Sequence, residues 1–281
     1  MLTLQTAAEL SAHIKKYKQS GLTVGFVPTM GYLHAGHLSL VQAAKAQCAV
    51  TVVSIFVNPK QFGPQEDLAR YPRDLERDTA LLADAGADIL FVPSVEEIYP
   101  SDNSLRTLKA DGQLAGAACG LSRPGHFDGV VTVVARLFDL VKPDRAFFGQ
   151  KDYQQLRIIQ KMTAAENYPV EIVDCPLLRE SDGLAMSSRN KYLTPTQRLQ
   201  VPVLYNSLCE AGRLLRLGVP LSAAESAMRA IISAAADIKL EYVEFLRRAD
   251  LSKLQDYAPD NTVILLAAQI GSTRLIDNLE V

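Results

Sequence analysis

Short apolar runs and amphipathic stretches alternate through the first 176 residues. Thr6 and Glu9 have the spacing of a capping box, which predicts a helix that ends near Gly21. The apolar run at 23–27 is typical of a strand and 36–47 of a helix, and the β-branched run at 49–57 indicates a buried strand. These three elements together predict a βαβ unit.

The same alternation continues as far as residue 176 and predicts further helices and strands of similar length. The predicted helices lie at 75–85, 130–141 and 153–166, and the predicted strands at 88–92, 145–148 and 170–174. Strands that alternate with helices on this scale form a parallel sheet covered on both faces. We therefore expect an α/β fold, with a doubly wound, Rossmann-like domain over residues 1–176.

The pattern changes after residue 176, where we place a domain boundary. A polar loop at 179–190 is followed by two helical segments, 195–217 and 221–236, and then by three strand-like segments without intervening helices, at 240–246, 262–268 and 273–279. Successive strands of this kind predict a mainly antiparallel sheet. Residues 177–281 are accordingly expected to form a smaller α+β domain that acts as a lid.

Composition excludes several classes of function. With 48% hydrophobic and 21% charged residues, and no apolar stretch near the roughly 20 residues that a bilayer requires, a soluble protein without a membrane role is predicted. The amino terminus lacks the basic and apolar segments of a secretion signal, which favours the cytoplasm. A net charge of −2 and the absence of a dense Lys/Arg run argue against nucleic acid as the main ligand.

The four cysteines, Cys48, Cys119, Cys175 and Cys209, contain no Cys-x-x-Cys pair. This spacing argues against a zinc site and against a disulfide framework. We expect reduced thiols that are mostly buried, and we assign no metal-ligating residues.

The stretch PTMGYLHAGH at 28–37 leaves the first predicted βαβ strand and enters its helix. Ligands of open parallel sheets bind beyond the carboxyl ends of the strands, where a helix amino terminus attracts phosphate. Gly31 and Gly36 allow close approach of the backbone to a nucleotide, and His34 and His37 lie one turn apart. The alternatives are half a zinc site or two surface histidines, but no H-E-x-x-H glutamate and no nearby third ligand support the former.

A second candidate segment, Phe148-Gly149-Gln150-Lys151-Asp152, also lies between a strand and a helix. Parallel topology brings it to the same edge of the sheet as residues 28–37. Lys151 can meet phosphates as a mobile charge, and Asp152 can bind a ribose hydroxyl or hold the lysine. Taken alone, such a pair is more often a solvated helix cap.

Residues 28–37 resemble the HxGH signature of the nucleotidyltransferase superfamily, in the extended form of pantothenate synthetases, or pantoate–β-alanine ligases. The resemblance continues in five further blocks in the same order: SIFVNPKQF at 54–62, YPR at 71–73, RPGHFDGV at 123–130, FFGQKDYQQ at 147–155 and GLAMSSRN at 183–190. It implies ATP-dependent condensation of pantoate with β-alanine through a pantoyl adenylate, which releases AMP and diphosphate. Mg²⁺ on the phosphates and a homodimer are implied as well.

The resemblance also implies a set of ATP-binding residues. Met186-Ser187-Ser188-Arg189 resembles a shortened KMSKS-type loop without its first lysine, and we infer that Lys151 takes over that role. Catalytic roles are implied for His34, His37, Lys151, Ser187, Ser188 and Arg189, with His37 as the proton donor. The implied ATP contacts are Met30, Gly31, Tyr32, Leu33, His34, Ala35, Gly36, His37, Gly149, Gln150, Lys151, Asp152, the main chain of Leu178, Met186, Ser187, Ser188 and Arg189.

For the substrates, the resemblance implies that Gln61 contacts pantoate and β-alanine and that Gln155 contacts pantoate, with Asn58 and Tyr71 close by. Neutral amides suit this role, because a bidentate arginine would stabilise the pantoate carboxylate and weaken it as a nucleophile. Arg123 is a candidate for binding pyrophosphate or the β-alanine carboxylate, with a surface arginine as the alternative. Without the resemblance, both glutamines would be ordinary loop or helix-surface residues.

Two other functions fit parts of the pattern. A cytidylyltransferase shares HxGH but keeps the nucleotide in its product, and the amide-lined pocket argues against it. A non-catalytic nucleotide-binding protein on the same fold is the alternative from another class, since fold alone does not establish activity. The presence of both histidines together with Lys151, Ser187 and Ser188 argues against it.

Overall fold

The computed structural model describes residues 1–64, 66–101 and 105–281. The contacts between residues divide the chain into two compact units. Unit 1 comprises Met1–Asp111, Arg123–Gln150 and Ile158–Pro176, and unit 2 comprises Gly112–Ser122, Lys151–Arg157 and Leu177–Val281. The domain boundary at residue 176 stays a prediction, and each unit is described by itself.

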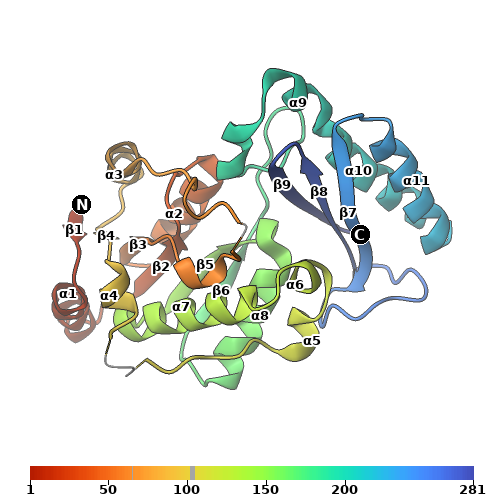
Figure 1. The fold of residues 1–281 in the computed structure, drawn as a ribbon. Helices are drawn as coiled ribbons and strands as arrows, with labels where there is room; N and C mark the ends of the chain where they lie inside the picture. Colours follow the sequence, from red (N-terminus) through yellow and green to blue (C-terminus); the bar gives the residue numbers. More distant parts are fainter. Residues whose placement is uncertain (65, 102–104) are drawn as a thin grey trace. The chain divides into compact units, whose positions relative to one another are not determined.

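Unit 1 is built on a six-stranded, wholly parallel sheet with the order β1-β4-β3-β2-β5-β6 (Figure 1). Its strands are β1 (Leu2–Leu4), β2 (Val24–Thr29), β3 (Val50–Ile55), β4 (Ile89–Phe91), β5 (Arg145–Gly149) and β6 (Glu171–Cys175). Apart from β1, this is the strand order of a Rossmann fold, whose direction of winding reverses between β2 and β5. The predicted α/β class is confirmed.

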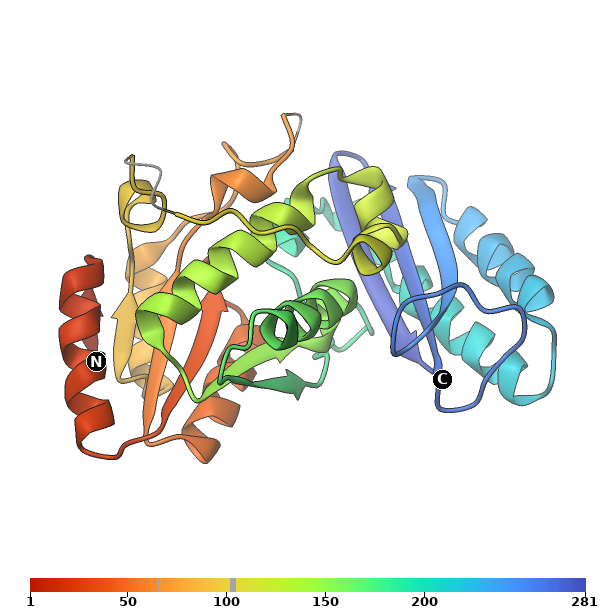
Figure 2. The ribbon, with the colours of Figure 1, turned by 90° about the horizontal axis from the view of Figure 1, so that it is seen from below.

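Helices cover the two faces of this sheet, and Figure 2 shows the long helix α7, in yellow-green, lying across one of them. The helices α2 (Ala35–Gln47) and α3 (Leu75–Asp84) pack together, and α7 (His126–Val141) packs against α1 (Ala7–Gln19) and the short α4 (Val95–Ile98). The capping box predicted at Thr6 and Glu9 is present. Burial on both faces explains why the central strands β2 and β3 are buried along nearly their whole length rather than at alternate positions.

Local differences from the prediction have identifiable causes. The helix α7 begins four residues before the predicted start, because Gly125 adopts a φ of 79° that turns the chain into it. The three-residue strand β1 was not predicted, since so short a segment carries no periodicity.

In unit 2, the predicted helix at 195–217 is two helices, α9 (Pro195–Gln200) and α10 (Pro202–Arg216). Pro202 lacks the N–H that a continuous helix needs and is suited to a first turn.

Unit 2 contains a three-stranded antiparallel sheet in the order β7-β8-β9, as predicted. The strands are β7 (Ile238–Arg247), β8 (Thr262–Ile270) and β9 (Thr273–Glu280). One core joins the apolar residues of this sheet to α10 and to α11 (Leu221–Ser233). The unit also contains two short helices, α5 (Gly112–Ala115) and α6 (Ala118–Ser122), and the start of α8 (Tyr153–Ala165).

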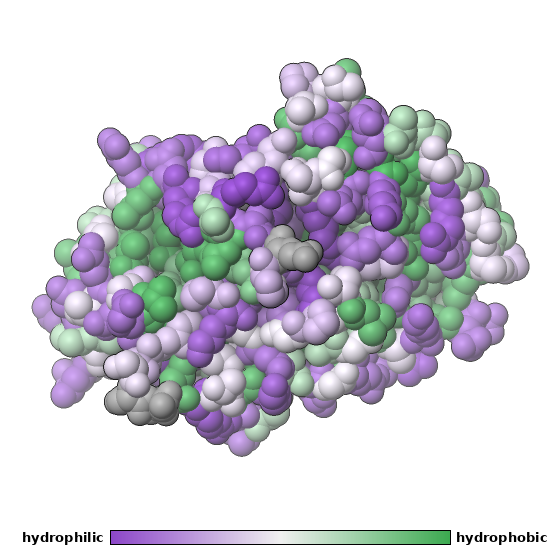
Figure 3. Space-filling model, in the orientation of Figure 1, coloured by the Kyte–Doolittle hydropathy of each residue, from purple (hydrophilic) through white to green (hydrophobic). Residues whose placement is uncertain are grey.

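The described residues bear on two expectations from composition. None of their helices has the length and apolar character needed to cross a bilayer. All four cysteines are free thiols, of which Cys119 and Cys175 are buried. The large exposed apolar side chains of unit 1 include Met1, Leu2, Leu75 and Val95, and Figure 3 shows apolar residues gathered on the side of this unit where α3 and α4 lie.

Candidate functional site

The turn after β2 is held in a conformation that few residues can adopt. Gly31 has a φ of 80° and Tyr32 a φ of 50°, both in the left-handed region. A Cβ atom on Gly31 would lie 2.9 Å from Ile55 Cγ2, so the close approach of β3 requires glycine there. Tyr32, one of the residues implied to contact ATP, therefore occupies a strained position.

Asp78 on α3 fixes this turn through its main chain. The Asp78 carboxylate accepts hydrogen bonds from Tyr32 N at 2.6 Å and Leu33 N at 2.8 Å. Burial raises the pKa of Asp78 above its ordinary value, although the two backbone hydrogen bonds act in the opposite direction. The sequence did not predict this role for Asp78, because no sequence pattern links it to a turn 46 positions earlier.

The two histidines stack at the start of α2. Their ring centroids lie 4.0 Å apart with an interplanar angle of 33°. The His34 N–H donates to His37 Nδ1 at 3.3 Å. Because that nitrogen accepts a hydrogen bond, we assign neutral His37 with its proton on Nε2. This tautomer makes Nε2 a hydrogen-bond donor, as an anionic ligand at a helix amino terminus requires.

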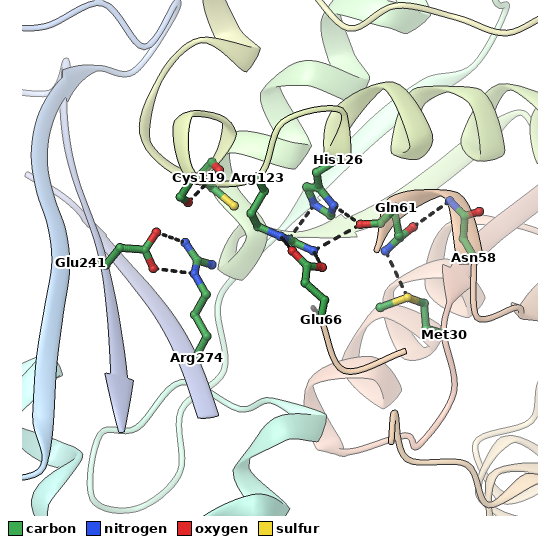
Figure 4. Close-up of polar contacts among 10 residues, drawn as sticks. Met30, Asn58, Gln61, Glu66, Cys119, Arg123, His126, Glu241 and Arg274 are labelled. Atoms are coloured by element: carbon green, nitrogen blue, oxygen red, sulfur yellow. Dashed lines mark hydrogen bonds and ion pairs between the residues drawn. The ribbon is translucent and has the colours of Figure 1, made fainter. Parts of the chain in front are cut away.

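Gln61 ends the 3₁₀ helix η1 (Pro59–Gln61) and is only 9% exposed. Its Nε2 donates to Met30 Sδ at 3.1 Å, and its Oε1 accepts from Asn58 Nδ2 at 3.1 Å (Figure 4). The turn packs against α7 at Gly129, where a Cβ atom would lie 2.4 Å from Lys60 O. Met30, an expected ATP contact, and Gln61, an expected substrate contact, are thus brought together.

Asn58 supports Gln61 rather than standing open beside it. The residue is 1% exposed. Its Nδ2 also donates to Gly129 O at 3.1 Å, and its Oδ1 accepts from Lys60 N at 3.2 Å and Tyr99 Oη at 2.7 Å. These bonds occupy both ends of the amide, so the geometry favours an orienting role. A direct contact with pantoate stays a prediction.

Arg123 belongs to a polar cluster and is not a surface arginine, since its side chain is 17% exposed. Its Nε and Nη2 donate to the two carboxylate oxygens of Glu66 at 2.7 and 2.6 Å, and its Nη1 lies 2.9 Å from His126 Nε2 (Figure 4). The Gln61 carbonyl accepts from Arg123 Nη2 at 3.3 Å and from His126 Nδ1 at 2.7 Å. Glu66 and His126 were not predicted, because no motif marks a partner 57 or 65 residues away.

The hydrogen bonds of this cluster also indicate the protonation of its members. Since a carbonyl only accepts, His126 Nδ1 carries a proton, and a neutral ring then accepts from Arg123 at Nε2. Burial alone would raise the pKa of Glu66, but hydrogen bonds and charge from Arg123 outweigh it and lower that pKa below its ordinary value. The arginine is thus held in an ion pair beside the Gln61 main chain. Tyr71, also in unit 1, is 6% exposed and packs edge-on against Phe62 at 5.8 Å.

The second candidate segment begins at Gly149, the last residue of β5, where an added Cβ would meet no atom within 4 Å. The 3₁₀ helix η2 (Gln150–Asp152) follows at once. In unit 2, Lys151 Nζ lies 3.3 Å from Asp152 Oδ1. Gln155 is half-exposed on α8, whereas its neighbour Gln154 is buried. The Gln154 amide is hydrogen-bonded to main-chain atoms of α5, of α6 and of Ala117 between them, so Gln155 stays the candidate of the two glutamines for a ligand contact.

The serine loop, defined as residues 178–190, also lies in unit 2. Met186 N donates to Leu178 O at 3.0 Å, which closes the base of the loop. Ser187 caps the 3₁₀ helix η3 (Ser188–Tyr192), because its Oγ accepts from Arg189 N at 3.3 Å. Ser188 is 7% exposed. The start of this short helix places its first backbone N–H groups beside Ser187 and Ser188.

Comparison with known proteins gives a consistent result along the chain. The family model for pantoate–β-alanine ligase matches residues 2–280. Pantothenate synthetase of Caldicellulosiruptor bescii is 48% identical over 282 residues, which cover 100% of this chain and 99% of that protein. The crystal structure of pantothenate synthetase from Thermus thermophilus matches with a TM-score of 0.94 and 46% identity, over 100% of this chain and 99% of that chain.

A third relative was solved with ligands. The crystal structure of pantoate–β-alanine ligase from Francisella tularensis, complexed with beta-gamma ATP and β-alanine, matches with a TM-score of 0.80 and 35% identity. The match covers 100% of this chain and 97% of that chain. The HxGH segment at 28–37, the turn at Pro59–Gln61 and the serine loop all fall within the matched residues. The chain belongs to the pantoate–β-alanine ligase family.

Proposed function

We propose that this chain condenses pantoate with β-alanine at the expense of ATP, through a pantoyl adenylate, and releases AMP and diphosphate. The observation that carries the proposal is the family match from residue 2 to residue 280. The β-alanine and nucleotide bound by the Francisella relative support the same substrates.

In the first step, a pantoate carboxylate oxygen attacks the α-phosphorus of ATP in line, and the bond to the β,γ-diphosphate breaks. Charge grows on the α-phosphate oxygens and on the departing diphosphate. His34, His37 Nε2–H, Lys151 and the serine loop supply donors and positive charge that are worth most at this transition state. Within the loop, the hydroxyls of Ser187 and Ser188 are the donors and the guanidinium of Arg189 is the positive charge.

In the second step, the neutral amine of β-alanine attacks the acyl carbon of the adenylate. The new C–N bond forms as the C–O bond to AMP breaks, and the amine loses a proton. The neutral tautomer assigned to His37 suits a group that donates to the phosphate oxygens in both steps. Exclusion of water protects the adenylate from hydrolysis between the steps.

Pantoate is held by neutral amides in this proposal, namely Gln61 and Gln155. Gln61 is pre-oriented by Asn58 and Met30, so little side-chain entropy is lost on binding. Arg123 is already bound by Glu66, which keeps a bidentate guanidinium from quenching the carboxylate nucleophile. Tyr71 packs against Phe62, the neighbour of Gln61 in sequence, and is a further candidate for contact with pantoate.

Mg²⁺ accompanies ATP in this proposal. No group of three or more His, Cys, Asp or Glu side chains able to hold a metal occurs among the described residues. In nucleotide sites magnesium is usually held mainly by phosphate oxygens and water, and it neutralises phosphate charge there. By family analogy we also propose a cytoplasmic homodimer.

The decisive experiment is isotope exchange between diphosphate and ATP. An adenylate mechanism predicts exchange that requires pantoate and proceeds without β-alanine. Exchange that appears only when β-alanine is present, or turnover of CTP without AMP, would refute it. Omitting pantoate from an otherwise complete reaction provides the blank.

A further inference from the structure

Strand β9 touches the main chain of Lys151. Asn278 is 6% exposed, and its Nδ2 donates to Lys151 O at 3.0 Å. Two residues along the same face of the strand, Glu280 Oε1 accepts from Tyr153 Oη at 2.8 Å. The carboxyl-terminal strand of the chain thus meets the segment 151–153 at two points, 127 positions away in sequence.

The preceding residue of β9 holds the serine loop. Asp277 is 4% exposed, and its oxygens accept from Arg179 Nη1 and Nη2 at 2.7 and 2.9 Å. Burial raises the pKa of Asp277, and the hydrogen bonds and charge of Arg179 act against that rise. A buried carboxylate needs such a partner, because an unpaired charge there would be strongly destabilising.

Arg179 is itself fixed on every side of its guanidinium. It donates to Gly183 O at 3.0 Å and to Asn278 O at 3.1 Å, and its Cζ lies 3.7 Å from the ring centroid of Tyr205. It also faces Ala185 in an antiparallel bridge within the serine loop. The base of the loop is therefore tied to the same strand that holds Lys151.

We propose that Asp277 and Asn278 are positioning residues, which hold Lys151 and the base of the serine loop in fixed register on β9. The inference rests on the proposed function, in which both segments act on the phosphates of ATP. A small displacement of such groups is costly, because their contribution depends on preorganised geometry. Neither residue touches a substrate in this role, since Asn278 acts through Lys151 and Asp277 through Arg179.

The test uses Asn278→Ala, which removes the amide donor without adding charge, and Asn278→Asp, which keeps the size but sets a carboxylate against the Lys151 carbonyl. We expect the kcat of ATP–diphosphate exchange to fall about 10-fold or more, while the KM for pantoate changes less than about 2-fold. Thr262→Val is the matched control. It removes a buried hydroxyl of unit 2 whose hydrogen bonds go to Ala258, so it reports the cost of a lost buried hydrogen bond alone.

A double-mutant cycle with Lys151→Ala separates positioning from plain stability. The alanine keeps the main-chain carbonyl, so a merely structural Asn278 would cost as much in that background as in the parent. Positioning predicts that Asn278→Ala slows the Lys151→Ala enzyme less than about 2-fold. The inference is overturned if the losses in kcat from Asn278→Ala and Lys151→Ala multiply in the double variant. It is also overturned if Thr262→Val slows exchange as much as Asn278→Ala does at the same thermal stability. Normal exchange by Lys151→Ala alone overturns instead the catalytic role proposed for that lysine.

Discussion

At Gln61 the side-chain amide lies between Asn58 and Met30, with its neutral oxygen and nitrogen both oriented. Gln61→Glu keeps the size and introduces a charge that opposes the pantoate carboxylate. Two unit charges about 4 Å apart at an effective dielectric near 20 interact by about 4 kcal/mol, which solvent reduces to about 1–3. We expect pantoate to bind 10- to 100-fold more weakly by calorimetry, with ATP affinity nearly unchanged.

The same substitution has a cost in stability. Because Gln61 is only 9% exposed, the glutamate loses the contact to Met30 and buries part of its charge. A loss of about 1–2 kcal/mol in the free energy of unfolding is expected. Affinities are therefore measured at a temperature where the variant is fully folded. Equal losses for pantoate and ATP would remove Gln61 from the pantoate site.

Glu66 gives unit 1 a pH-dependent stability. Its carboxyl has a pKa below the ordinary 4.5 in the folded chain, so the unfolded chain binds more protons than the folded one near that pH. The ion pair with Arg123 therefore stabilises the fold fully above pH 4.5, and this contribution is lost as the pH falls through the lowered pKa.

Glu66→Gln tests that dependence. Since both side chains are partly exposed, the wild-type protein should exceed the variant by only about 1 kcal/mol in free energy of unfolding near pH 7. The difference should shrink towards zero when urea denaturation is repeated at successively lower pH below 4.5. A gap that stays constant down to pH 3 would show that the Glu66 carboxylate contributes nothing through its charge.

Among the secondary elements, the packing of α7 against η1 decides where Gln61 lies. An added Cβ on Gly129 would approach Lys60 O to 2.4 Å and Gln61 Cα to 3.0 Å. Gly129→Ala should push η1 away from the helix, raise the KM for pantoate and lower the free energy of unfolding by about 1–3 kcal/mol. Steady-state kinetics and urea denaturation measure the two effects.

Gly112 supplies the matched control, because a Cβ there would meet no atom within 4 Å. Gly112→Ala should leave the KM for pantoate unchanged and raise stability by up to about 1 kcal/mol, through reduced freedom of the unfolded chain. Equal kinetic effects of the two alanines would disprove the steric argument at Gly129.

At the same scale, element type followed from sequence where the apolar pattern was clear. The segment that became α10 has apolar positions at helical spacing, and the segment that became β3 is a continuous β-branched run typical of a buried strand. The start of α7 depended on a positive φ at Gly125, and the division between α9 and α10 on the ring of Pro202. Both residues are visible in the sequence, yet glycine and proline permit several local outcomes, which packing resolves.

For the whole molecule, the homodimer implied by family resemblance stays a prediction. Sedimentation velocity at micromolar concentration should give a mass of twice the 30.7 kDa of one chain. The exposed apolar side chains of unit 1 make self-association physically reasonable, because such surface is stabilised by burial. A single boundary at the mass of one chain across the concentration range would exclude a stable dimer.

The sequence by itself determined the parallel sheet, the antiparallel carboxyl-terminal strands and the family, because hydrophobic period and short motifs are local properties. The tertiary structure alone decided which groups hold the motifs in place. Asp78 under the HxGH turn, Glu66 on Arg123 and Asn278 on Lys151 lie 46, 57 and 127 positions from their partners. A lone acidic or amide residue carries no signal of such a partner, since only the folded chain brings the two within hydrogen-bond distance.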